Sequence, residues 1–253
     1  MVQLPILTQY CNRFLRINDF RDYCPNGLQL EGRVEVRNII TGVTACQRLL
    51  DLAVELHADA VLVHHGYFWK NEEAMITGIK KKRIATLLEH DISLLAYHLP
   101  LDAHADVGNN IELGRRLHLQ NMSCQEQGTL KGLLWQGELL NPCAADEFSR
   151  QLATALNRKP LHLPSASQQK IQRVAWCSGG AQGYIEQAAA LGVDAYISGE
   201  VSEQTFHQAN ELNVHYFAAG HHATESYGVQ ALGRHLAEQF SINTQYVDIF
   251  NPV

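Results

Sequence analysis

Three features are missing from this 253-residue sequence, and each absence argues against a class of protein. No Cys-x-x-Cys occurs among the six cysteines, which disfavours a thiolate zinc site or a thioredoxin-like redox motif. No apolar run approaches the roughly 18 residues that a membrane helix needs. Residues 1–6 lack a basic segment leading into an apolar one, so we predict no signal peptide and a cytoplasmic protein with reduced cysteines.

Charge is also scarce, at 18% of residues, with a formal net charge of −6. The short basic run 80–83 is more typical of a solvated helix face than of a nucleic-acid patch. Hydrophobic residues make up 46%, which fits a soluble globular protein with a sizeable core. We therefore expect no membrane partner and find no support for nucleic acid in the charge. The unusual number is 13 histidines.

An internal repeat organises the chain. Residues 37–65 and 172–200 align without a gap at an offset of 135, with identities such as Gln47/Gln182 and Asp59/Asp194. Each copy begins with a short apolar run, continues with helical spacing and ends in a second apolar run. These segments are 39–43, 49–56 and 60–63 in the first copy, and 174–177, 184–191 and 195–198 in the second. A strand, a helix and a strand at this spacing predict a βαβ unit with parallel pairing.

The match resumes with a further helix and strand in each copy. These are 84–88 and 93–96 in the first copy, and 204–212 and 216–219 in the second. We therefore predict an α/β fold of two intertwined, related repeats with mixed, largely parallel sheets. The expected divisions are 1–125 for the first repeat with an N-terminal helix, 126–170 for an inserted segment and 171–253 for the second repeat. The insertion, with a strand over 133–139 and a helix over 144–156, is expected to pack on the core or at a subunit contact.

Histidines and carboxylates gather at three predicted strand ends. His64 and His65 follow the first, Asp102 the second, and His221 with Glu225 the third. In open α/β sheets, ligands bind beyond the carboxyl ends of the strands. Pro100 is expected to keep the segment before Asp102 in a loop. A helix that begins near Ala223 would place His221 and Glu225 on one face.

Each strand end also has a structural explanation. The His64-His65 pair could be hydrogen-bonded loop residues, Asp102 could cap a helix that starts near residue 108, and Glu225 could belong to a capping box. Together, however, the five side chains form a nitrogen and oxygen donor set suited to Zn, Mn, Fe, Co or Ni. Five ligands exceed the need of one catalytic zinc and suit two ions with a bridging carboxylate. We predict two divalent metal ions of unknown identity.

The sequence resembles the short bacterial form of a dinuclear-metal family, the YbgI-like or NIF-three-like GTP cyclohydrolase I type 2 homologues. The motifs occur in fixed order and are Asp22-Tyr-Cys-Pro-Asn-Gly-Leu, Gly42-Val-Thr-Ala, Val63-His-His-Gly, His98-Leu-Pro-Leu-Asp, Gly199-Glu-Val-Ser and Gly220-His-His-Ala-Thr-Glu. The resemblance implies two α/β repeats, a metal centre between them and a toroidal homohexamer. It also implies that His64, Asp102 and Glu225 hold one ion, and that His65, His221 and Glu225 hold the other.

Two further side chains are candidates for catalysis. His98 aligns with His221 in the repeat and could orient a ligand or a substrate. Glu200 aligns with His65 and could serve as a general base or proton shuttle. A purely structural hydrogen bond remains the alternative for both. Asp22, Asn26 and Thr44 are weaker candidates for the edge of the pocket.

Three hypotheses about function follow. The first is a hydrolase that uses a metal-bridging water on a small nucleotide- or pterin-like substrate, whose class is implied only by the family's name. The second is a metal-binding regulatory or metal-delivery protein without catalysis. In the third, the ions only staple the two repeats together.

Overall fold

The computed structural model describes residues 1–126, 128, 130–166 and 169–253. Contacts within the chain divide it into two units, one of residues 1–101 with 228–250 and one of residues 102–227 with 251–253. The predicted divisions 1–125, 126–170 and 171–253 follow sequence similarity instead and stay a prediction. Residues 127, 129, 167 and 168 of the predicted insertion lie outside the described residues.

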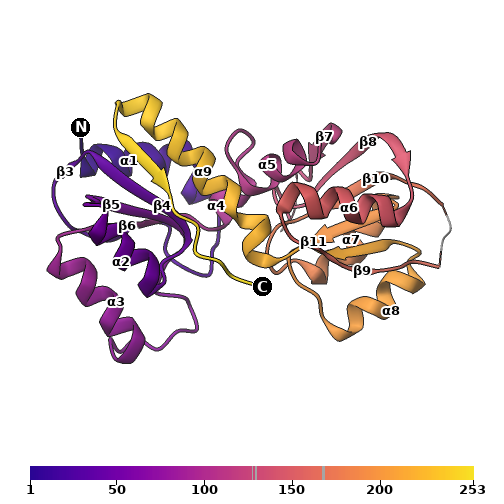
Figure 1. The fold of residues 1–253 in the computed structure, drawn as a ribbon, viewed down its shortest axis with the longest axis horizontal. Coiled ribbons are helices and arrows are strands. Elements are labelled where there is room, and N and C mark those ends of the chain that lie inside the picture. Colours follow the sequence, from indigo (N-terminus) through magenta and orange to yellow (C-terminus); the bar gives the residue numbers. More distant parts are fainter. Residues whose placement is uncertain (127, 129, 167–168) are drawn as a thin grey trace. The chain divides into compact units, whose positions relative to one another are not determined.

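The first unit contains a mixed sheet with helices on both faces (Figure 1). Its strands follow the order β13 (Asn243–Tyr246), β4 (Asn38–Thr44), β5 (Ala60–His65), β6 (Ser93–Ala96) and β2 (Gly27–Leu30). Pairing is parallel from β13 to β6, and β2 runs antiparallel to β6. The helices are α1 (Leu4–Phe14), α2 (Gln47–Glu55), α3 (Gly78–Glu89) and the later part of α9 (His221–Phe240). A small pairing of β1 (Val2–Gln3) with β3 (Glu35–Val36) completes it.

Successive residues of β4 show how the helices cover this sheet. A Cβ on Gly42 would lie 2.6 Å from the Leu49 side chain, so the missing side chain lets α2 pack closely on this strand. A Cβ on Gly233 of α9 would lie 3.1 Å from the methyl group of Thr41, the preceding strand residue. Because neighbouring strand residues point to opposite faces, α2 and α9 cover opposite sides of the sheet.

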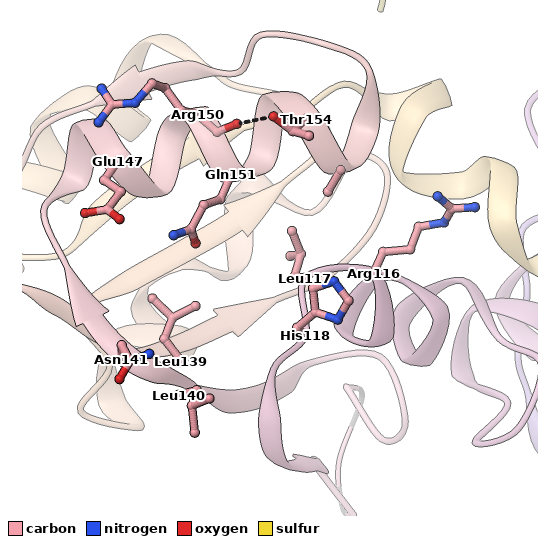
Figure 2. Close-up of a pocket in the computed structure, with 11 residues that line it drawn as sticks. Arg116, Leu117, His118, Leu139, Leu140, Asn141, Glu147, Arg150, Gln151 and Thr154 are labelled. Atoms are coloured by element: carbon pink, nitrogen blue, oxygen red, sulfur yellow. Dashed lines mark hydrogen bonds between the residues drawn. The ribbon is translucent and has the colours of Figure 1, made fainter.

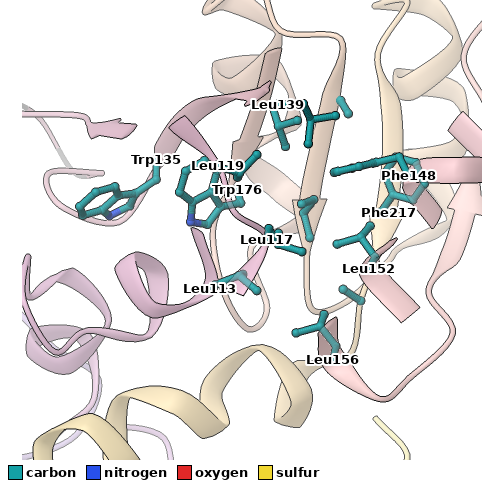
Figure 3. Close-up of a cluster of buried hydrophobic side chains, with 14 of the residues drawn as sticks. Leu113, Leu117, Leu119, Trp135, Leu139, Phe148, Leu152, Leu156, Trp176 and Phe217 are labelled. Carbon is teal, nitrogen blue, oxygen red and sulfur yellow. The ribbon is translucent and has the colours of Figure 1, made fainter. Parts of the chain in front are cut away.

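The second unit has its own mixed sheet and its own core. The strand order is β7 (Gln120–Cys124), β8 (Trp135–Cys143), β10 (Ile171–Trp176), β11 (Ala195–Ser198), β12 (His215–Ala218) and β9 (Leu161–Leu163). Strands β10, β11 and β12 are parallel, and the outer pairings are antiparallel. The helices are α5 (Asn109–Arg116), α6 (Ala145–Leu156), α7 (Ile185–Ala190) and α8 (Glu203–Glu211). Phe148 and Leu152 of α6 pack with Trp176 and Phe217 in a buried cluster (Figure 3).

The internal repeat is visible in the strand register. Ile39 pairs with Ala60 in the first unit, and Val174 pairs with Ala195 in the second, at the offset of 135 found in the sequence. In both units the last strand of the parallel series pairs with an antiparallel edge strand, β2 beside β6 and β9 beside β12. The predicted α/β class with mixed sheets is confirmed, but the sheets are only partly parallel, because three of the five pairings in the second sheet are antiparallel.

Several local expectations need correction. Pro100 does not keep its segment in a loop, because it lies in the short helix α4 (Leu99–Ala103). It stands in the first turn, where a backbone N–H has no intrahelical acceptor and a proline costs little. Helix α9 begins at His221 rather than near Ala223. The predicted insertion also contributes a strand to the second sheet, because β8 lies between β7 and β10, while its helix α6 packs on the core as expected.

Helix α9 starts in the second unit and continues into the first at Gly228. A helix with the length and hydropathy to span a bilayer is not found in the described part of the chain.

Candidate metal centre

Three histidines come together in the first unit. His64 and His65 end β5, and His98 follows β6, the parallel neighbour of that strand. The ring centroids of His64 and His65 are 4.6 Å apart, and His98 lies 5.1 Å from the first and 5.8 Å from the second. One ring nitrogen of each lies within 4.8 Å of the other two. The sequence placed His64 and His65 as ligands and His98 beside them, and the first unit has all three in one cluster.

Each of these rings has a partner at Nδ1. His64 Nδ1 lies 2.9 Å from the carbonyl oxygen of Tyr97, and His65 Nδ1 lies 3.2 Å from Thr44 Oγ1. His98 Nδ1 lies 2.7 Å from Asp22 Oδ1. Metal-binding histidines commonly have such an outer partner, which fixes the orientation of the ring.

Asp22 is held by a network from its own loop and from the start of α4. Its carboxylate accepts hydrogen bonds from the backbone N–H groups of Tyr23 and Leu99 and from Asn26 Nδ2. Asn26 Oδ1 in turn accepts the backbone N–H of His98 at 2.7 Å. Burial acts to raise the pKa of Asp22, but the contact with His98 and the other hydrogen bonds outweigh it and lower that pKa. The weaker sequence candidates Asp22, Asn26 and Thr44 thus all lie beside the histidine cluster.

His221, Glu225 and Glu200 form a cluster in the second unit. His221 opens α9 and Glu225 lies one turn later, so their side chains share a face, with His221 Nε2 3.0 Å from Glu225 Oε2. On its other side, His221 Nδ1 lies 2.7 Å from Glu200 Oε1, just after β11. Burial acts to lower the pKa of His221, but the two carboxylates prevail and raise it to about 9. The sequence placed Glu200 near the ligands, and here it contacts one directly.

Gly179 is a contributor that sequence reasoning missed. Its φ of +65° is in the left-handed region, and a Cβ here would collide with the Glu225 carboxylate and lie 3.2 Å from His221 Nε2. Its N–H donates to Thr224 Oγ1 at 3.0 Å. Only the glycine pair 179–180, shortly after a predicted strand, could have signalled it. The space that this glycine leaves open faces the two predicted ligands.

Asp102 is buried in the second unit and is fixed by neighbouring side chains. Its Oδ1 accepts hydrogen bonds from Asn109 Nδ2 at 2.8 Å and from Ser178 Oγ at 3.1 Å. Asn110 adds a bond to the Asp102 backbone carbonyl, and its own Oδ1 accepts the Ser178 N–H. Gly108, not Asp102, is the N-cap residue of α5, so the capping alternative is wrong. Nearby Cys177 has a pKa raised by burial and then by the charges of Asp102 and Glu225.

A separate cavity of about 650 Å³ lies in the second unit between α5, β8 and α6 (Figure 2). Its described lining includes none of the predicted site residues. Arg116 and Arg150 point in different directions in Figure 2, and the Arg116 guanidinium stacks on Tyr227 at 3.7 Å. The two guanidinium groups therefore do not converge on one point of this cavity.

The donor chemistry of each unit fits a divalent metal. The first unit offers imidazoles, and the second offers an imidazole and carboxylates, all with fixed orientations. Nitrogen and oxygen donors without thiolate suit Zn, Mn, Fe, Co and Ni.

The chain is similar to known proteins over nearly its whole length. The family model described as Duf34/NIF3 (NGG1p interacting factor 3) matches residues 2–252. A protein named GTP cyclohydrolase 1 type 2 homolog from Pseudomonas aeruginosa is 53% identical over 251 residues, which cover 99% of each chain. One of the same name from Yersinia pestis is 52% identical over 241 residues, which cover 95% of this chain and 96% of the relative.

Solved structures extend the similarity to three dimensions. The structure described as protein ybgI, of unknown function, has a TM-score of 0.95 and 47% identity, with full coverage of both chains. A protein of Thermus thermophilus, TTHA1606, has a TM-score of 0.90 and 31% identity, also with full coverage of both. The chain belongs to the Duf34/NIF3 family.

Proposed function

We propose that this protein is a dinuclear-metal hydrolase that acts on a small nucleotide- or pterin-like molecule. The observation that carries the proposal is the clustering of fixed imidazoles and carboxylates just beyond parallel strands in each unit. The name shared by relatives with about half of their residues identical, GTP cyclohydrolase 1 type 2 homolog, supports the substrate class.

The proposed ligands are those that the family resemblance implies. His64, Asp102 and Glu225 would hold one ion, and His65, His221 and Glu225 the other. Two such ions, when bound, supply Lewis-acid activation and a water that is nucleophilic near neutral pH.

The surrounding groups orient the ligands. The Tyr97 backbone carbonyl and the Thr44 hydroxyl fix the two adjacent imidazoles, and the Asn109 and Ser178 side chains fix the Asp102 carboxylate. Glu200 accepts the Nδ1–H of His221 through Oε1. Its side chain is 37% exposed, so solvent or substrate can reach it, and we assign its Oε2 the role of proton acceptor.

Activity of the metal-loaded protein tests this function. Nucleoside triphosphates, pterins, cyclic amides and phosphoesters are offered to the protein loaded with Mn²⁺, Zn²⁺, Co²⁺, Ni²⁺ or Fe²⁺. We expect hydrolysis of at least one class, lost on chelation and in Asp102→Asn. A protein that binds metal but hydrolyses none of them would contradict the proposal.

Two glycines provide a matched test of the ligand pair. Gly179→Ala places a methyl group against Glu225 and His221, whereas a Cβ on Gly183 meets nothing within 4 Å. We expect Gly179→Ala to weaken metal binding about tenfold or more, as changes beside a metal site commonly do. Gly183→Ala should bind like the wild type. Equal affinity in both variants would argue against ligand roles for His221 and Glu225.

A metal-delivery or regulatory protein is the second candidate function. Partial exposure of the His221–Glu200 pair, at 28% and 37% of the side chains, favours exchange with solvent. A delivery protein should lose its metal rapidly to a mild chelator and show no turnover, whereas an enzyme should retain it during turnover. If the ions only hold the two repeats together, the Asp102→Ala variant should fail to fold. A folded, inactive variant would exclude that hypothesis.

We also propose that the protein assembles as a homohexamer in the cytoplasm, as the family resemblance and the sequence imply. Light scattering of the full-length protein should give six times the mass of one chain. A monomer or dimer at micromolar concentration would contradict this assembly.

A further inference from the structure

We infer that Trp69 is a substrate-binding residue, and that its indole ring stacks on a planar heterocycle of the substrate beside the histidines of the first unit. The inference deepens the proposed function and rests on it for the class of the substrate, but it requires binding only and not hydrolysis. It assigns the recognition of the ring to a residue of this chain, where the proposed function has only the name of the relatives to support that class.

Trp69 is the tryptophan that the fold leaves partly exposed. The sequence contains three tryptophans, and Trp135 and Trp176 are buried in the second unit, at 5% and 0% exposure. Trp69 is half-buried and lies four residues beyond His65, the last residue of β5. Because tryptophan gains more from burial than most side chains do, a partly exposed one beside a polar cluster indicates a surface that binds a ligand.

The indole ring of Trp69 lies next to two histidines without stacking on either. Its centroid is 5.0 Å from that of His98 and 6.0 Å from that of His65. The ring planes differ by 84° and 54°, so neither imidazole covers the indole face to face. Aromatic pairs have centroids about 4.5–7 Å apart, so a heterocycle stacked on Trp69 would have its substituents near the imidazoles.

The segment before Trp69 is anchored to the first sheet. Gln29 of β2 holds the backbone of Tyr67, because its Oε1 accepts the Tyr67 N–H at 2.7 Å and its Nε2 donates to the Tyr67 carbonyl at 3.1 Å. The buried Tyr67 hydroxyl donates to the Ala45 carbonyl at 2.7 Å. Gly66 leaves the room for this arrangement, since a Cβ there would collide with the Gln29 side chain. These contacts fix the chain two residues before the indole.

The segment after Trp69 is anchored by a turn. The Trp69 N–H donates to Glu72 Oε2 at 3.1 Å, and the Trp69 carbonyl accepts the Glu72 N–H at 2.8 Å. Lys80 of α3 pairs with the same carboxylate at 3.4 Å. Between the two anchors, Phe68 has a φ of +64°, which a bulky residue adopts only where its surroundings impose it. A ring that is fixed before the ligand arrives loses little conformational entropy on binding.

The hydrogen bond of the indole narrows the class of ligand. Its Nε1–H donates to the Gly66 carbonyl at 3.2 Å and is therefore used within the chain. What Trp69 offers a ligand is its π face, which attracts planar rings and cations. A cation would be repelled by the proposed divalent ions and by Lys80, whose Nζ lies 5.0 Å from the centroid of the neighbouring Phe68 ring. A neutral planar heterocycle, as in a purine nucleotide or a pterin, fits better.

Ligand binding to the full-length, Zn²⁺-loaded protein tests the inference. GMP and neopterin are the probes that carry a ring, and ribose 5-phosphate is the counterpart of GMP without one. Calorimetry measures the affinity of each. We expect Trp69→Ala to weaken the binding of GMP and neopterin by about 5- to 150-fold, the range that stacking of one base contributes, and to leave that of ribose 5-phosphate unchanged. The matched control is Phe68→Ala, which removes a neighbouring ring that is 36% exposed and should bind like the wild type.

Tryptophan fluorescence distinguishes stacking from a structural role of the side chain. GMP should quench the fluorescence of the wild type when light that tyrosine does not absorb is used, because the other two indoles are buried in the second unit. Ribose 5-phosphate should not quench it. Trp69→Phe keeps an aromatic face, so it should retain most of the affinity for GMP and lose the quenching. Circular dichroism and the thermal midpoint confirm that each variant is folded.

The outcomes separate this inference from the proposed function. Wild-type affinity for GMP and neopterin in Trp69→Ala would overturn the inference, as would a wild type that binds neither probe at millimolar concentration or equal losses in Trp69→Ala and Phe68→Ala. Hydrolysis of another class of substrate would survive each of these results. Binding of GMP that depends on Trp69, in a protein that hydrolyses nothing, would support the inference and contradict only the proposed reaction.

Discussion

Asp59 and Asp194 occupy matching positions in the two repeats, and each accepts hydrogen bonds from two consecutive backbone N–H groups. Asp59 Oδ2 accepts the backbone N–H groups of Arg37 and Asn38, and its Oδ1 pairs with Arg33 at 2.9 Å. Asp194 Oδ2 accepts those of Gln172 and Arg173. Each carboxylate anchors the start of the first strand of its repeat to the loop before the second.

Replacing Asp59 should therefore destabilise the first unit. Asp59→Ala removes the acceptor of two backbone N–H groups and the ion pair with Arg33, which keeps its bonds to the His90 and Asp91 carbonyls, and this should cost about 2–3 kcal/mol of unfolding free energy. Asp59→Asn keeps an oxygen acceptor and should cost about half as much. Urea unfolding measures both. If the two variants lose equal stability, the hydrogen-bond acceptor is not what matters.

The candidate site was predictable at the residue scale wherever its chemistry has a local signature. A histidine or carboxylate directly after an apolar run indicates a polar group at a strand end, and this pattern predicted His64, His65 and Glu200 as site residues. Ser178 and Asn109 have no such signature. Ser178 contacts Asp102 from 76 residues away, so its role exists only in the folded chain. Gly179 could not be predicted for the same reason, because its role is to leave room for the Glu225 and His221 side chains, which only the folded chain places beside it.

At the scale of secondary-structure elements, the edge strands are those that the sequence did not predict. The central strands are continuous apolar runs and were predicted within a few residues. Strands β7 and β13 have the sequences QNMSC and NTQY, which contain only exposed and half-buried positions and lack an apolar run. Pairing with a neighbour far away in sequence defines them, such as Asn243 with Asn38. A strand that is stabilised mainly by backbone hydrogen bonds to its neighbour need not contain an apolar run in its sequence.

The edge strand β9 carries a pH-dependent contact with β12. His162 Nε2 lies 3.1 Å from His215 Nδ1, which also accepts the Ser165 N–H at 3.2 Å, so Nδ1 must be unprotonated. Burial lowers the pKa of both histidines, and the charge of His215 lowers that of His162 further. Asp146 and Asp194 act in the opposite direction, on His162 and His215 respectively, but do not outweigh the burial.

Because both folded pKa values lie below the unfolded value of about 6.5, the unfolded chain binds more protons as the pH falls. Stability should therefore be full above about pH 7 and decline as the pH drops through 6.5 towards the folded pKa values. Urea unfolding at about pH 7.5 and about pH 5.5 measures this slope. His215→Asn should flatten it, whereas His118→Gln, on an exposed histidine, should not. An unchanged slope in His215→Asn would show that the pair contributes nothing.

At the scale of the whole molecule, the described residues of each unit contain a buried hydrophobic cluster. Leu49 belongs to the buried cluster of the first unit and Leu152 to that of the second, and both are fully buried. This division was not evident from sequence alone, because the first unit is completed by residues 228–250, which follow the second repeat's strands. The pattern of apolar residues shows which segments are buried, but it does not show which distant segments pack together in one unit.

Two cores predict two cooperative units in hydrogen exchange. Leu49→Ala should cost about 2–5 kcal/mol through lost burial and a cavity, and it should speed exchange of β5 amides while β11 amides keep their protection. Leu152→Ala should do the reverse, which makes each variant the control for the other. Helix α9 belongs to both units, so its amides before Gly228 should follow β11 and those after it should follow β5. If either variant deprotects β5 and β11 equally, the two cores unfold as one, and α9 transmits the loss from one unit to the other.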